Sequence, residues 1–114
     1  MNSNELALLG AKLLDSKKAS DVKIIDIAQK SSFADCLVIA TGNSDRQVAS
    51  LTDDVEDAFA KEGFFVKGIE GKNGSGWVLM DFGDVIVNIF TSEMRDKYNI
   101  EKVWGDCAVI DVEE

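Results

Sequence analysis

The apolar residues of the first part of the chain recur at a helical period. Leu6, Leu9 and Leu13 fall on one face of a helix that we expect over residues 4–17. This pattern predicts an amphipathic helix that buries its leucine face against the rest of the fold.

A second helix is predicted after Ser44. Gln47 stands three places after this hydroxyl, which is the spacing of a capping box at a helix N-terminus. The apolar positions that follow at helical spacing are Val48, Leu51, Val55 and Phe59. Gly63 is placed to end the helix. The helix also carries an acidic run, Asp53, Asp54, Glu56 and Asp57. Such runs usually form a solvated face.

Shorter apolar runs predict strands. Residues 21–27 alternate in the manner of a strand, and residues 37–40 are continuously apolar, which suits a strand buried on both faces. Residues 66–69 predict a short strand, and the glycine-rich stretch 70–76 predicts a loop. Residues 108–112 predict a last strand near the end of the chain.

The strongest local pattern is a β-hairpin. Two strand-like runs, residues 77–82 and 85–90, flank the pair Gly83-Asp84, which is typical of a two-residue hairpin loop. One face of this hairpin is wholly apolar, with Val78, Met80, Phe82, Val85, Val87 and Ile89. The other, the mixed face, carries Trp77, Leu79, Asp81, Ile86, Asn88 and Phe90. The apolar face should pack under helices.

The mixed face has two interpretations. Large apolar groups beside Asp81 and Asn88 suit a surface that is covered only some of the time, such as a protein interface. Alternatively, the face is a second core surface under another helix, with the two polar residues at its wet rim.

The end of the chain completes the predicted architecture. Ser92 can cap a short helix, and the pair Trp104-Gly105 closes this helical segment. Helices before and after runs of strands predict an α/β fold, on the border of α+β, with a mixed sheet flanked by helices.

Length and charge restrict the function. The chain has 114 residues, which fits one domain over residues 1–114. Twelve basic and 21 acidic side chains leave a net charge of −9. We therefore expect little direct contact with nucleic acid, and a basic protein is a suitable partner. The chain has no apolar run long enough to span a membrane, and its first residues lack the basic charge of a signal peptide. We therefore expect a cytoplasmic protein that does not bind a membrane.

Few residues offer chemistry. Histidine is absent, which removes Ser-His-Asp and Cys-His nucleophile pairs and imidazole metal sites. Cys36 and Cys107 are expected to be reduced, buried thiols. The stretch 42–45 has the position of an anion site between strand and helix, although an ordinary turn is the better interpretation. Asp81 and Asp84 could hold magnesium, but Asp84 also suits a hairpin tip for its backbone geometry alone.

Several segments resemble the Iojap family, the ribosomal silencing factors. They are residues 35–46, 68–71, 77–90, 93–98 and 101–104. Each motif is short, but their order and spacing over roughly residues 20 to 105 make the resemblance specific.

The resemblance implies a fold and a function. It implies a five-stranded mixed sheet flanked by helices, related in outline to nucleotidyltransferases, and a homodimer in solution. It also implies a translation regulator that is not an enzyme and needs no cofactor or metal. Such a protein binds the fourteenth protein of the large ribosomal subunit, blocks joining of the small subunit, and so lowers protein synthesis when nutrients are short.

The resemblance places the partner contact on the mixed face. Trp77 matches the family's tryptophan at the ribosomal contact, and Leu79, Asp81 and Asn88 accompany it, with Phe90 at lower weight. Four further residues match the family and suit packing and capping: Glu70, Tyr98, Glu101 and Trp104. The alternative function is a metal-dependent nucleotide-binding enzyme with a nucleotidyltransferase-like fold. Asp81 and Asp84 straddle a turn, which is the wrong spacing for a catalytic Asp-x-Asp pair.

Overall fold

Helices and strands interleave along the chain, which the computed structural model describes over residues 1–72 and 74–111. In chain order the elements are α1 (Ser3–Ser16), β1 (Ser20–Asp26), β2 (Cys36–Gly42), α2 (Asp45–Lys61), β3 (Gly68–Glu70), β4 (Trp77–Asp81), β5 (Val85–Thr91), α3 (Ser92–Tyr98), α4 (Ile100–Val103) and β6 (Ala108–Asp111). No helix among the described residues is long and apolar enough to cross a membrane.

The strands form one mixed sheet in the order β3-β4-β5-β2-β1-β6. Strands β2 and β5 run parallel, and the other neighbouring strands run antiparallel. The sheet has six strands, so the five strands implied by the family resemblance were wrong. Strand β6 lies at the edge of the sheet, pairs with β1 and corresponds to the apolar run at residues 108–112. Val112 of that predicted strand lies outside the described residues.

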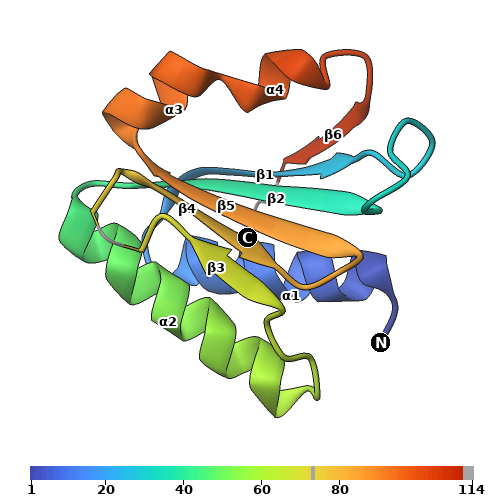
Figure 1. The fold of residues 1–114 in the computed structure, drawn as a ribbon, viewed down its shortest axis with the longest axis horizontal. Helices are drawn as coiled ribbons and strands as arrows, with labels where there is room; N and C mark the ends of the chain where they lie inside the picture. Colours follow the sequence, from blue (N-terminus) through green and yellow to red (C-terminus); the bar gives the residue numbers. More distant parts are fainter. Residues whose placement is uncertain (73, 112–114) are drawn as a thin grey trace.

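Helices cover both faces of this sheet (Figure 1). Helices α1 and α2 lie on one face, and the shorter α3 and α4 lie on the other. The mixed sheet flanked by helices predicted from the sequence is therefore confirmed. The larger core lies under α1 and α2 and includes the predicted apolar hairpin face: Val78, Met80, Phe82, Val85, Val87 and Ile89. A smaller core lies under α3 and α4 and is built on Ile25, Ile27, Leu37, Ile39 and Phe90.

Helix α1 forms as predicted, but its buried face is turned from the expected leucine stripe. Leu6, Gly10 and Leu14 are buried, whereas Leu9 and Leu13 are half-buried at the edge of the core. The reason is the close approach of α2, because a Cβ atom on Gly10 would lie only 2.9 Å from Cζ of Phe59. Gly10 of α1 therefore faces Phe59 of α2. A leucine at this position would keep the two helices farther apart.

The capping box of α2 is half confirmed. The hydroxyl of Ser44 accepts a hydrogen bond from the backbone N–H of Gln47 at 3.1 Å, as predicted. The side chain of Gln47 accepts from the N–H of Asn43 instead of returning to Ser44. The apolar stripe of the helix is buried as expected, with Val48, Leu51, Val55 and Phe59 all inside. The helix ends at Lys61, two residues before Gly63.

The hairpin of β4 and β5 has the predicted register. Trp77 pairs with Phe90 and Asp81 with Ile86, and the N–H of Phe82 donates to the carbonyl of Val85 at 3.0 Å. Gly83 has φ +92°, the positive value that the first central residue of a type II′ turn requires. The two faces of the hairpin are therefore those predicted from the sequence.

Several boundaries differ from the predictions, and the single helical segment expected between Ser92 and Trp104 is divided into α3 and α4 at Asn99, which has φ 43°. The short strand β3 begins at Gly68, two residues later than expected, and ends at Glu70. Helix α3 is capped by Thr91 in place of Ser92, and the Thr91 hydroxyl accepts from the N–H of Met94 at 3.4 Å. Thr91 is also the last residue of β5, so the strand continues directly into the helix without a separate turn.

We expect Gly10→Val to lower the free energy of unfolding by about 2 kcal/mol, because the added methyls overpack the contact with Phe59. Gly68→Val is the control, since a Cβ atom there meets nothing within 4 Å. Urea unfolding of both variants measures the difference. Equal stability of the two variants would show that α1 and α2 do not approach closely at Gly10.

Candidate functional site

The mixed face of the hairpin is covered at one end and open at the other. Asn88 and Phe90 are buried, with exposures of 2% and 1%. Trp77, Leu79 and Asp81 are half-buried. The difference arises because α3, on this face of the sheet, contacts β5 and β2, whereas Trp77, Leu79 and Asp81 belong to β4, nearer the edge of the sheet (Figure 1). The core interpretation therefore holds for Phe90 and Asn88, although Asn88 is buried and its expected place at a wet rim was wrong. For the half-buried residues the interface interpretation stays a prediction.

Trp77 is held by three neighbours. Its ring stacks on Phe90 with centroids 5.1 Å apart and an interplanar angle of 23°. Tyr98 of α3 lies 4.8 Å away, tilted by 44°. The indole Nε1 donates a hydrogen bond to Oδ1 of Asn88 at 3.0 Å. The ring is thus fixed in one orientation by β5 below it and α3 beside it.

A hollow of about 230 Å³ opens next to this tryptophan. It is lined by Glu70, Gly71, Ser75, Trp77, Leu79, Met94 and Tyr98. Two predicted contact residues, Trp77 and Leu79, therefore share one depression with residues of α3. Met94 was missed by the sequence reasoning, although its spacing of four from Tyr98 places both on one helical face.

Asp81 and Asp84 of the hairpin both accept hydrogen bonds, Asp81 through its carboxylate and Asp84 through its backbone carbonyl. Oδ1 of Asp81 accepts a hydrogen bond from the N–H of Gly83 at 2.8 Å. The carbonyl of Asp84 accepts from the backbone N–H groups of Asp35 and Cys36, at 2.7 Å and 3.1 Å. Within residues 1–72 and 74–111, no group of three or more His, Cys, Asp or Glu side chains could hold a metal ion. The geometry of Asp81 is that of a carboxylate closing its own turn.

The acidic run on α2 faces partly outward. Asp53 and Asp57 are exposed, and Asp54 and Glu56 are half-buried. Asp53 forms an exposed ion pair with Lys72 at 3.3 Å. Exposed pairs of this kind contribute at most about 1 kcal/mol. The run therefore contributes to the charge of the surface more than to stability.

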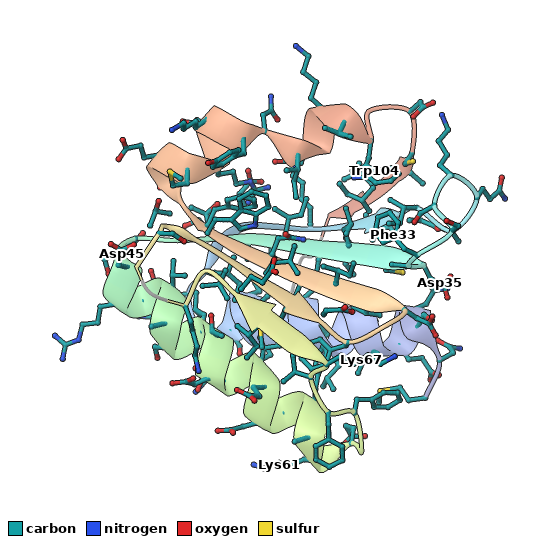
Figure 2. All side chains as sticks on the ribbon, viewed as in Figure 1. Phe33, Asp35, Asp45, Lys61, Lys67 and Trp104 are labelled. Carbon is teal, nitrogen blue, oxygen red and sulfur yellow. The ribbon has the colours of Figure 1, made fainter. Side chains whose placement is uncertain are left out.

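The four remaining family-matched residues lie at packing and pairing positions. Tyr98 and Glu70 border the hollow beside Trp77. Glu101 accepts from Nε of Arg95 at 2.9 Å. Trp104, labelled in Figure 2, lies near Phe33 with ring centroids 6.2 Å apart. Tyr98 and Glu70 thus belong to the candidate surface, whereas the last two residues support α4.

The two cysteines lie apart and are free. Cys36 is buried, as predicted, and its Sγ–H donates to Oδ1 of Asn4 at 3.4 Å. Burial raises the pKa of the Cys36 thiol from 9.0 to about 11, and the nearby charges of Asp26 and Asp35 add to the rise. Cys107 is half-buried, so full burial was wrong for this residue.

The whole chain, residues 1–114, matches the family described as Ribosomal silencing factor during starvation. The chain belongs to this family of ribosomal silencing factors. It is 37% identical over 113 residues to Ribosomal silencing factor RsfS of Bacillus subtilis, covering 99% of this chain and 96% of the relative. It is 35% identical over 113 residues to Ribosomal silencing factor RsfS of Halalkalibacterium halodurans, covering 99% of this chain and 97% of that one. The resemblance drawn from the short motifs is confirmed.

The fold of this silencing-factor chain is also similar to solved structures. A crystal structure of a protein from Chromobacterium violaceum superposes with a TM-score of 0.89 at 34% sequence identity. The match covers 92% of this chain and 88% of that one. Family membership fits a regulator of the ribosome and associates the chain with that assembly.

For this silencing factor, we expect alkylation at pH 8 to modify Cys107 first and Cys36 at least about tenfold more slowly. The reactive thiolate of Cys36 is suppressed by its raised pKa and by burial. The folded state favours the protonated form of this thiol, and this contribution to stability is fully present below pH 9.0. It should be lost as the pH rises from there through about 11. Mass spectrometry of timed iodoacetamide reactions measures the order, and faster modification of Cys36 would contradict its burial.

The hydrogen bond between Trp77 and Asn88 should be visible in a double-mutant cycle. We expect Asn88→Leu to lower the free energy of unfolding by about 1–3 kcal/mol, because it leaves the indole N–H without an acceptor. In a Trp77→Phe background the same change should cost about 1 kcal/mol less, since no donor remains. Urea unfolding of the four proteins measures this coupling, and additive effects would show that the bond is not formed.

Proposed function

We propose that this chain binds the large ribosomal subunit through its fourteenth protein and blocks joining of the small subunit, lowering protein synthesis under nutrient limitation. Family membership supports a ribosomal silencing role. The observation that carries the binding site is the hollow beside Trp77, on the part of the mixed face that α3 leaves uncovered. A half-buried apolar depression with a polar rim is the usual form of an interface centre.

Within this surface the residues have different roles. Leu79 and Tyr98 offer apolar area to a partner, because each lines the hollow and keeps exposed surface. Asp81 is half-buried near the hairpin turn and contributes a carboxylate to the rim. Asn88 and Phe90 are buried behind Trp77, so we assign them a supporting role, in which they hold the indole in place.

The charge of the protein favours a basic partner. The net charge of −9 attracts a basic ribosomal protein over long range and repels the phosphates of ribosomal RNA. Glu70 adds a carboxylate directly at the border of the hollow. The proposal therefore includes a protein contact with little direct contact to nucleic acid. It also includes the homodimer that the family resemblance implies.

Leu79 is a cleaner probe of this surface than Trp77. Removing the indole also removes the stack on Phe90 and the bond to Asn88, and truncating a packed tryptophan typically costs about 3–5 kcal/mol of stability. A loss of binding by Trp77→Ala is then mixed with loss of structure. Leu79 is only half-buried, so its truncation leaves the fold largely intact.

We expect Leu79→Ser to weaken binding to isolated large subunits by about 2 kcal/mol, roughly 30-fold, because the centre of the contact loses its apolar group. The matched control is Leu8→Ser, the same change at a 40% exposed leucine of α1 on the opposite side of the sheet. Co-sedimentation through a sucrose gradient with separate large and small subunits measures both.

The proposal also requires an effect on subunit joining. The unmodified protein and Leu8→Ser should migrate with the large subunit and lower the yield of joined ribosomes when small subunits are added. Leu79→Ser should do neither at the same concentration. Undiminished binding by folded Leu79→Ser would move the contact away from the hollow, and migration with neither subunit by the unmodified protein would remove the proposed function.

A further inference from the structure

Arg95 is a charged residue of α3 that lies almost wholly inside the protein. Its side chain is 7% exposed. The guanidinium Nε donates to Oε1 of Glu101 at 2.9 Å, and Nη1 donates to the hydroxyl of Thr41 at 2.9 Å. Nη1 also donates to the backbone carbonyl of Asp21 at 2.5 Å. A buried guanidinium requires such partners, because burial of an unpaired charge is strongly unfavourable.

The remaining nitrogen completes the same arrangement. Nη2 lies 3.3 Å from Oδ2 of Asp21, as an ion pair without hydrogen-bond geometry. One guanidinium thus joins α3 to β1 through Asp21, to β2 through Thr41 and to α4 through Glu101. We call these four residues the Arg95 clamp.

The backbone of β1 is shaped at the clamp. Asp21 has φ +50°, and the pairing of β1 with β2 shifts register between Ser20 and Lys23. Irregularities of this kind redirect backbone and side-chain groups at the end of a strand. Here the redirected carbonyl and carboxylate of Asp21 both reach Arg95.

Helix α3 needs such an attachment. It has seven residues and ends at Tyr98, and the capping residue Asn99 has the left-handed conformation with φ 43°. A helix this short is not stable by itself, so its position depends on tertiary contacts. The same helix carries Met94 and Tyr98, which form one wall of the hollow beside Trp77. Arg95 lies between these two residues in sequence, and its buried side chain bonds to α4, β1 and β2.

We propose that Arg95 is a positioning residue for the partner-binding surface: the Arg95 clamp fixes α3 on the sheet, and α3 in turn holds Tyr98 and Met94 against Trp77 to form the hollow. The clamp therefore acts through Tyr98 and makes no contact with the partner itself. This inference rests on the proposed function, because it assigns the hollow to the ribosomal contact.

The geometry requires arginine specifically. Together the nitrogens of its guanidinium reach three elements, whereas a lysine presents a single ammonium on a flexible stem. Arg95→Lys preserves the charge and should still lose the link to at least one element. Glu101→Gln keeps the shape of the residue and removes its charge. Glu93→Gln is the matched control, because it removes one charge from an exposed position of the same helix.

The first measurement is the near-ultraviolet circular dichroism of Trp77. The sequence has two tryptophans, so the measurement is made in a Trp104→Phe background, in which Trp77 alone remains. We expect Arg95→Lys and Glu101→Gln to reduce the Trp77 band, because the tilted Tyr98 ring moves, while Glu93→Gln leaves it unchanged. An unchanged band in both clamp variants would overturn the proposal.

The second measurement is the affinity for isolated large subunits, with and without Tyr98→Ala. Arg95→Lys should weaken binding about tenfold when Tyr98 is present, and by less than about twofold in the Tyr98→Ala background. A merely structural residue would weaken binding by the same factor in both backgrounds, and that result would overturn the proposal. If the unmodified protein bound no large subunit, the proposed function would fall, and the Trp77 band alone would decide whether the clamp positions α3.

Discussion

The structure depends on the unequal covering of the two faces of one sheet. Strand β2 is buried along its whole length, so both faces of the central sheet must be shielded from water. Helices α1 and α2, with 14 and 17 residues, cover one face, where the larger core lies. The other face receives only α3 and α4, with seven and four residues, and Trp77, Leu79 and Asp81 of β4 stay half-buried there. As a consequence, the hollow lined by Trp77, Leu79 and Tyr98 stays open beside α3, and this hollow is the candidate site.

Trp77 lies at the border between the covered and the open part of this face. One side of its ring stacks on buried Phe90, and its indole nitrogen is satisfied by Asn88, so the residue belongs to the core. Its half-buried remainder lines the hollow, so it also belongs to the surface. In the proposed contact, a residue that the core orients in advance loses little side-chain freedom on binding, which favours affinity. The two roles of Trp77 are therefore physically linked.

Local patterns were sufficient for most of the fold. The hairpin register followed from Gly83-Asp84 and the alternation around it, and the second helix followed from Ser44 and the apolar stripe after it. The rotation of α1 about its axis could not be predicted, because Gly10 carries no hydrophobic signal and its importance lies in the space left for Phe59. The burial of Asn88 and the role of Met94 depend on where α3 lies, which is a tertiary property. The cap at Thr91 was missed because the strand passes into the helix without a turn.

The position of α3 explains why so small a helix is tied by a buried charge. An apolar residue at position 95 would bury surface, but it would leave the rotation and translation of a seven-residue helix weakly determined. A guanidinium whose nitrogens face Glu101, Thr41 and Asp21 tolerates few arrangements, because any displacement leaves a buried polar group unpaired. Directional bonds thus provide the specificity of position that the small contact area of α3 cannot. The bonds of Arg95 thus determine the shape of the hollow through the position of α3, even though Arg95 itself does not line the hollow.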